Sequence, residues 1–258
     1  MYRSLDAAGI RFLRSQLVLV AAGPGTGKSA LVLALALRAR VPTLIYSADS
    51  DAFVQLTRSL SILTGWPLEV SAKALLADEI GGAAEQLAGL PVRMNYNASP
   101  TLDDLETTMA AYEEVYGDFP QLVVVDNITN VRGEGKGSEE DPFGGLESLM
   151  DYLHGMARET SACVIGLHHV TGPYVDATKP IPLSGVKGQV TRVPEMVLTL
   201  HRADRLCVSA VKNRSGRADP SGQTYVELLF EPERMHIADV PADQQTWASE
   251  EGDMFGGW

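Results

Sequence analysis

Residues 17–29 read LVLVAAGPGTGKS, and this stretch decides the fold of the chain. Its first five residues are a short apolar run, as expected of a buried strand. The remainder is a glycine-rich turn that ends in Gly-Lys-Ser, and such a turn between a strand and a helix binds the phosphates of a nucleotide. Residues 30–37 follow directly and are strong helix formers. The order of strand, turn and helix therefore predicts a P-loop nucleoside triphosphatase.

Each part of this turn has a chemical role in binding a nucleotide. Glycines let successive backbone N–H groups curl around a phosphate chain, at which the dipole of the next helix also points. The Lys28 ammonium is placed for the β- and γ-phosphates and the Ser29 hydroxyl for Mg²⁺, so we expect ATP and Mg²⁺ as cofactors. Ala22 replaces the usual first glycine, a mild departure. The residues expected to bind the nucleotide are Gly23, Pro24, Gly25, Thr26, Gly27, Lys28 and Ser29.

Apolar runs and helical segments alternate along the chain, which is typical of an α/β fold with a mainly parallel sheet flanked by helices. From residue 196 the pattern changes to closely spaced strands separated by turn residues, which predicts antiparallel strands at the C-terminal edge of the sheet. The expected strands are residues 17–21, 43–47, 91–96, 122–126, 162–168, 196–201, 206–211 and 225–230, and the expected helices are 29–39, 51–64, 101–116 and 145–160.

Composition and charge restrict the class of protein. With 258 residues, 45% of them hydrophobic and 21% charged, the chain has room for one large α/β domain. The net charge of −12 argues against a nucleic-acid coat, yet basic residues outnumber acidic ones between Lys179 and Arg217, as a confined polyanion site requires. Cys163 and Cys207 lie in expected strands and are interpreted as buried, reduced side chains. We see no signal peptide or membrane span and expect a cytoplasmic protein.

An acid at the end of a strand supplies the second element of nucleotide chemistry. Leu122–Asp126 is four apolar residues followed by Asp126, which places this carboxylate beside the phosphate loop at the carboxyl edge of the sheet. Its expected role is to hold Mg²⁺ through water, together with Ser29.

The carboxylate that orients the attacking water has two candidates. The strand at residues 43–47 is followed by Asp49 and Asp51. Either acid would suit the N-cap of the next helix, and Asp51 is well placed for that role. We favour Asp49 as the catalytic carboxylate.

The order of these motifs resembles the RecA-like core of hexameric replicative helicases, namely the DnaB family and the related RepA-type plasmid helicases. The resemblance covers about residues 8–240 and implies a RecA-like fold. The family has a catalytic Glu at the position of Asp49. Its polar sensor, Gln or His, corresponds to His169. We do not favour the alternative in which His168 and His169 bind a metal as a pair, because adjacent residues of a strand point to opposite faces. The motifs are GPGTGKS, YSADSD, LVVVDN, VIGLHH, LSGVKGQV and VKNRSG.

The same resemblance implies a DNA-binding loop and a contact between subunits. The loop at residues 172–190 corresponds to one that lines the channel of such rings, where basic side chains and backbone amides would bind single-stranded DNA in a salt-sensitive way without reading its sequence. An ordinary solvated loop is the alternative. Lys212 and Arg214 match an element that enters the ATP site of the neighbouring subunit, which implies a homo-oligomer, expected to be a hexamer. The expected DNA-binding residues are Lys179, Lys187, Gly188 and Arg192.

We therefore expect an ATPase core at residues 1–240 and a flexible acidic tail at 241–258. The tail would dock on a replication partner or else pack back on the domain. We expect no counterpart of the N-terminal domain of the DnaB family, as in motor cores familiar from phage replication. The expected function is a ring-forming, ATP-dependent DNA helicase or translocase on single strands. The alternatives are a mediator resembling RecA/Rad51 paralogues, which uses ATP as a switch to load or anneal DNA, and a phosphotransferase in the style of clock kinases.

Overall fold

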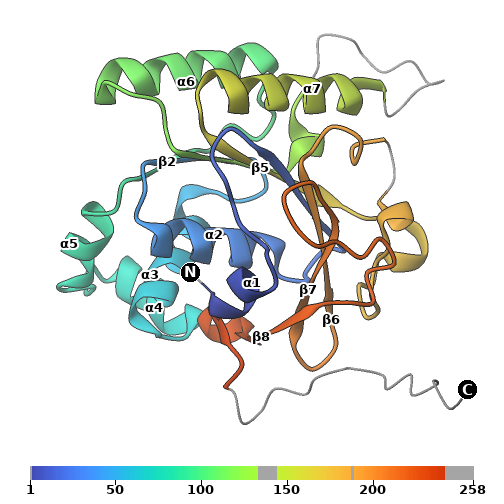
Figure 1. Ribbon diagram of the computed structural model, residues 1–258. Coiled ribbons are helices and arrows are strands. Elements are labelled where there is room, and N and C mark those ends of the chain that lie inside the picture. The colour runs from blue at the N-terminus through green and yellow to red at the C-terminus, as the bar shows by residue number, and fades with distance from the viewer. Residues whose placement is uncertain (1, 133–143, 187–188, 242–258) are drawn as a thin grey trace, which may run out of the picture.

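The strands form one mixed sheet with helices on both of its faces in the computed structural model (Figure 1). The structure describes residues 2–132, 144–186 and 189–241. Within these ranges the strand order is β3-β2-β4-β5-β1-β6-β7-β8-β9. The strands are β1 (Leu17–Ala22), β2 (Thr43–Ser47), β3 (Val92–Asn95), β4 (Leu122–Asp126), β5 (Cys163–His169), β6 (Met196–Arg202), β7 (Leu206–Asn213), β8 (Val226–Glu231) and β9 (His236–Asp239).

Two groups of helices cover the sheet. Helices α6 and α7 lie across one face, and α1, α2 and α3 lie on the other (Figure 1). The helices are α1 (Arg3–Ala7), α2 (Lys28–Ala39), α3 (Ala52–Thr64), α4 (Leu68–Leu76), α5 (Ala83–Ala88), α6 (Leu102–Tyr116) and α7 (Gly144–Glu159), with short 3₁₀ turns η1 (Ile128–Asn130), η2 (Gly172–Tyr174), η3 (Leu183–Gly185) and η4 (Pro232–Arg234).

Strand β1 shows why its sequence is apolar throughout. Val18 and Val20 pack into the core on the side of α1 and α2, whereas Leu17 and Leu19 pack into the core on the side of α6 and α7. All six residues of β1 are buried, because a central parallel strand covered on both faces has no solvent-exposed side. Burial on both faces of the sheet therefore explains why the sequence of β1 is a continuous apolar run.

The sheet changes from parallel to antiparallel at β6. Strands β2, β4, β5 and β1 pair in parallel with one another, and β6 also runs parallel to β1. Strands β7, β8 and β9 then continue the sheet antiparallel. The expected α/β fold with a parallel core and C-terminal antiparallel strands is confirmed.

Several short elements were not expected from the sequence. These are α1, α4, α5 and β9, which have five, nine, six and four residues. Segments this short carry little periodic signal, and packing against the rest of the fold determines their structure. The helix expected at residues 51–64 begins at Ala52, because Asp51 is its N-cap.

Part of the sequence-based interpretation lies outside the described residues. This applies to Lys187, Gly188 and residues 242–258 of the predicted tail. Cys163 and Cys207 are free and buried, as expected. Within the described ranges, no helix combines the length and the apolar character that crossing a membrane would require.

Candidate nucleotide-binding site

The phosphate loop connects the carboxyl end of β1 to the first residue of α2. Gly27 is the N-cap of α2 and has φ +117°, a left-handed conformation that residues with a Cβ rarely adopt. A Cβ at this position would also lie 2.8 Å from Cε1 of Phe230 in β8. Gly23 is restricted by a neighbour instead, since a Cβ there would lie 2.0 Å from the carbonyl oxygen of Val175. The loop therefore needs glycine at both positions, for backbone geometry and for space.

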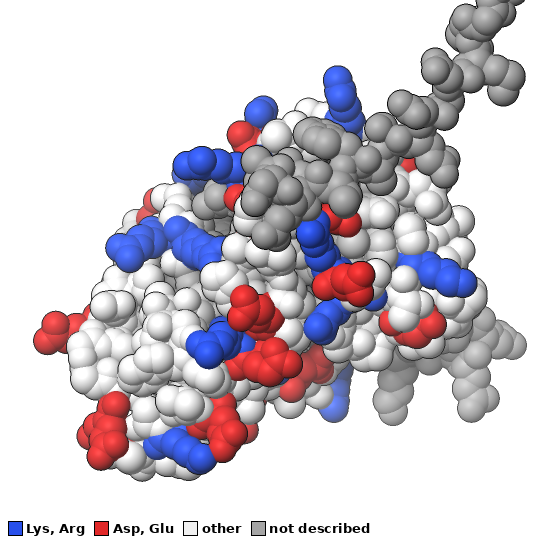
Figure 2. Space-filling model, turned by 90° about the horizontal axis from the view of Figure 1, so that it is seen from below, with Lys and Arg blue, Asp and Glu red and all other residues white. Residues whose placement is uncertain are grey.

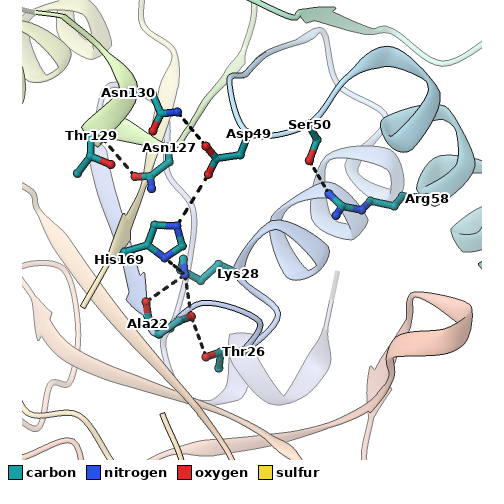
Figure 3. Close-up of polar contacts among 11 residues, drawn as sticks. Ala22, Thr26, Lys28, Asp49, Ser50, Arg58, Asn127, Thr129, Asn130 and His169 are labelled. Carbon is teal, nitrogen blue, oxygen red and sulfur yellow. Dashed lines mark hydrogen bonds and ion pairs between the residues drawn. The ribbon is translucent and has the colours of Figure 1, made fainter. Parts of the chain in front are cut away.

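Lys28 is folded against the loop that it belongs to. Its Nζ donates hydrogen bonds to the carbonyls of Ala22 and Gly23, both at 3.0 Å, and lies 3.1 Å from Nδ1 of His169 (Figure 3). The residue is only 5% exposed. Burial lowers the pKa of Lys28 to about 8, partly offset by the carboxylates of Asp126 and Asp49. The cation thus lies where a phosphate chain would meet the loop.

Ser29 and Asp126 place a hydroxyl and a carboxylate near this cation. Asp126 is the last residue of β4 and is 7% exposed. Burial raises the pKa of Asp126, and a hydrogen bond from Ser29 partly offsets this rise. Among the described residues, no group of three or more His, Cys, Asp and Glu side chains could hold a metal. Mg²⁺ does not need such a group, because it is bound through one or two protein oxygens, nucleotide phosphates and water. A buried carboxylate beside a hydroxyl fits that mode of binding.

The structure separates the two acids that follow β2. Asp51 accepts a hydrogen bond from the backbone N–H of Val54 at 2.8 Å and so caps α3. Asp49 instead lies in the site, where Oδ1 accepts from Nδ2 of Asn130 at 2.8 Å and Oδ2 lies 3.8 Å from Nε2 of His169 (Figure 3). The geometry favours Asp49 as the carboxylate that faces a nucleotide, and its catalytic role stays a prediction.

His169 comes from the strand beside β1. Ala22 and His169 are register partners in β1 and β5, which brings the imidazole next to the phosphate loop. Burial, and then the charge of Lys28, lower the pKa of His169. The Lys28 ammonium can only donate, so next to charged Lys28 a neutral imidazole accepts at Nδ1 and carries its proton on Nε2, which faces Asp49.

Three polar side chains at this edge were not predicted as site residues from the sequence. Asn130, in η1, holds Asp49, and Arg58 of α3 donates from Nη1 to Oγ of Ser50 at 3.1 Å (Figure 3). Gln55 of α3 is buried near Asp126. Asn130 was detectable, because the short segment that follows β4 begins at the carboxyl edge of the sheet. Gln55 and Arg58 were harder to find, since their positions depend on how α3 packs.

The segment expected to bind DNA is partly packed into the domain. Ala177, Ile181 and Val186 are buried, so these residues are anchored rather than solvated. Lys179 is exposed, and Arg192 forms an ion pair with Glu147 of α7 at 2.6 Å. Figure 2 shows one face of the molecule, on which basic and acidic side chains are interspersed. DNA binding by Lys179 and Arg192 stays a prediction.

Lys212 and Arg214 lie far from the phosphate loop of their own chain. Met196 is paired with both Val18 and Asn213, so the C-terminal end of β7 lies beside the first residues of β1. The phosphate loop follows the other end of β1. Lys212 Nζ donates to the carbonyls of Thr191 and Arg192, both at 2.7 Å, and Arg214 Nη2 donates to the latter at 3.2 Å. The structure therefore does not bring this pair to the site formed by Lys28 and Asp126.

The loop after β1 and the acid that ends β4, in a sheet of this order, define a nucleotide-binding P-loop domain of the RecA-like class. Residues 1–232 match the model of the DnaB-like helicase C terminal domain, and the chain belongs to this family. This confirms the family resemblance inferred from the motifs.

Relatives and solved structures agree with this assignment. The chain is 58% identical over 246 residues to the "Gene 65 protein" of Mycobacterium phage L5, covering 93% of this chain and 91% of that one. It is 61% identical over 230 residues to the "Gene 65 protein" of Mycobacterium phage D29, covering 86% and 99% of the two chains.

Among solved structures, the fold is similar to a DnaB-like replicative helicase, described with its interactions with primase, with TM-score 0.79 and 17% identity. The match covers 93% of this chain but only 61% of that one. A solved ATPase domain gives the same TM-score and identity, with coverage of 93% of this chain and 90% of that one. The RadB recombinase is a more distant match, with TM-score 0.59, 15% identity and coverage of 93% and 98%. At these identities the structures show the fold alone.

Proposed function

We propose that this chain is the motor of a DNA helicase or translocase, which assembles as a ring, hydrolyses ATP with Mg²⁺ and moves along single-stranded DNA during replication. The observation that carries the proposal is the position of Lys212 and Arg214 at the edge of the sheet opposite to their own phosphate loop. A DnaB-like domain with its arginine at that edge can complete only the site of a neighbouring copy. Hydrolysis would then require an oligomer.

Within one site, each residue has a defined task. The backbone of residues 23–27 and the Lys28 ammonium bind the phosphates, and Ser29 and Asp126 would hold Mg²⁺. When bound, the ion would neutralise charge between the β- and γ-phosphates. Asp49, fixed by Asn130, would orient the water, and the guanidinium of Arg214 from a neighbour would stabilise charge on the transferred phosphoryl group.

Contact between the phosphate loop and the following segment supports coupling to DNA. Gly23 lies directly against the carbonyl of Val175, and η2 and η3 follow β5, whose last residue is His169. A change at the phosphates would therefore reach the segment that bears Lys179. Lys179, Arg192, Lys187 and Gly188 are the residues we assign to phosphates of the DNA strand.

ATP hydrolysis with and without single-stranded DNA tests this function. We expect DNA of any sequence to stimulate hydrolysis, and raised salt to weaken the stimulation because the contacts are to phosphates. A Lys28→Ala variant should keep its fold and lose nucleotide binding. Hydrolysis at the normal rate in that variant would refute the assignment of the site.

A further inference from the structure

Gln55 is a polar side chain buried in the interior between α3 and the sheet. It is 3% exposed. Its Nε2 donates to Oγ of Ser47, the last residue of β2, at 2.9 Å. The Ser47 hydroxyl in turn donates its one proton to the carbonyl of Ser50 at 2.7 Å, so toward Gln55 it must accept. This network fixes the amide: Nε2 faces Ser47 and Oε1 points the other way.

The Oε1 atom of Gln55 is a buried acceptor for which the described residues provide no hydrogen-bond partner. Gln55 also lines a small cavity, whose other polar lining residues are Ser29 and Asp126. Apolar side chains form the remaining walls, namely Val32, Leu33, Ile45, Val124 and Leu167. A buried acceptor without a partner is costly, which makes this cavity a place where a ligand with protons to donate is stabilised.

The size and the lining of the cavity select the ligand. There is room for about one water molecule. A water in such a place needs two to four polar partners, and three polar residues, Gln55, Asp126 and Ser29, line the cavity. A cation would not be satisfied there, because most of the wall is apolar. Water has two protons to donate, one for Oε1 of Gln55 and one for a carboxylate oxygen of Asp126.

We propose that Gln55 is a positioning residue of the nucleotide site, which holds one buried water against the carboxylate of Asp126 and so fixes the orientation in which Asp126 and Ser29 receive the metal. The inference rests on the proposed function, because it assumes that these two residues meet Mg²⁺. It extends the metal site into α3, whose N-cap, Asp51, is two residues from Asp49. The hydrogen bonds of Gln55 also involve Ser47 and Ser50, which lie on either side of Asp49 in the sequence.

Metal-dependent nucleotide binding by the full chain tests the proposal. In Gln55→Met, which keeps the length of the side chain and removes the acceptor, we expect the affinity for Mg²⁺ in the presence of ATP to fall by about 10–100-fold, the usual effect of losing a partner of a metal ligand. Affinity for ATP in excess chelator should stay unchanged. Gln86→Met, at an exposed position of α5, is the matched control and should match the wild type in both measurements.

A second variant keeps the test decisive if Gln55→Met does not fold. Gln55→Glu retains the acceptor, and in its protonated form also the donor to Ser47, so its affinity for the metal should not fall. Equal metal affinity in folded Gln55→Met and the wild type would overturn the proposal, as would a loss of affinity in Gln55→Glu or an equal loss with and without metal. Failure of the wild type to bind ATP would instead refute the proposed function, which separates the two outcomes.

Discussion

The imidazole of His169 lies between Lys28 and Asp49, with Nδ1 3.1 Å from Nζ of Lys28 and Nε2 3.8 Å from Oδ2 of Asp49. These three residues come from different elements, namely β5, the start of α2 and the segment after β2. The imidazole thereby links the cation that would bind the phosphates to the carboxylate that would orient water. Any movement of His169 therefore changes its contacts with both Lys28 and Asp49.

The first prediction concerns His169 itself. His169→Ala should retain ATP binding and lose most of the stimulation of hydrolysis by DNA, because Lys28 and Asp49 then lose the side chain that links them to β5. His169→Gln, which keeps a donor and an acceptor on a side chain, should preserve the stimulation. Steady-state hydrolysis with and without single-stranded DNA distinguishes them. Full stimulation in the alanine variant would show that His169 is not part of the coupling.

Lys28 should take up protons when a nucleotide binds. Its pKa is about 8 in the free protein because burial disfavours the ammonium. Phosphates favour the charged form and raise that pKa, so uptake should grow from about pH 7 to about pH 9, where most of the free protein holds a neutral amine. Calorimetric titration with ATP in buffers of different ionisation enthalpy measures the uptake. Absence of any pH dependence would mean that Lys28 does not meet the phosphates.

The opposite-edge position of Arg214 predicts complementation between subunits. Arg214→Ala should bind ATP normally and lose about 10³-fold or more of its DNA-stimulated hydrolysis. Mixing it with Lys28→Ala should restore part of the activity, because the two defects then fall in different composite sites. Arg217→Ala, at an exposed position three residues further along the chain, is the control and should behave as the wild type. A mixture of exchanging subunits no more active than its parents would argue against a role in trans.

The fourth prediction is a loss of stability in mild acid caused by His168. Burial lowers its pKa from 6.5 to about 4, so below about pH 6.5 the unfolded chain binds a proton that the folded chain excludes. The free energy of unfolding should therefore decrease as the pH is lowered. His168 should account for a decrease of roughly 2 kcal/mol between about pH 6.5 and pH 5. Urea unfolding of His168→Gln should lack this part of the decline, and His236→Gln, exposed on β9, should keep it. Identical pH profiles for all three proteins would refute the effect.

Local sequence was sufficient to predict the parallel core. The ranges 43–47 and 122–126 agree with β2 and β4 residue by residue, because a buried parallel strand is a continuous apolar run with polar residues at its end. The phosphate loop was equally readable, since its glycines and Gly-Lys-Ser act through local backbone geometry. The sequence alone did not decide which of Asp49 and Asp51 caps α3. One hydrogen bond, from the backbone N–H of Val54 to Asp51, shows that Asp51 is the cap.

Long-range packing determined the parts that could not be predicted. The place of Lys212 and Arg214 follows from the pairing of β6 with both β1 and β7, which no local pattern encodes. Gly23 and Val175 are in contact although they are distant in the sequence. Gln55 and Asp126 are also distant in the sequence and line the same cavity. Such contacts become visible only when the order of the strands is known.

Displacement of a labelled strand from a forked duplex tests the central claim most directly. With ATP and Mg²⁺ the wild type should release the strand, and Lys28→Ala and Arg214→Ala should not, because movement along DNA requires hydrolysis at sites shared between subunits. DNA-stimulated hydrolysis without any displacement, or strand annealing supported equally by a non-hydrolysable ATP analogue, would contradict a motor and favour a mediator that uses ATP as a switch.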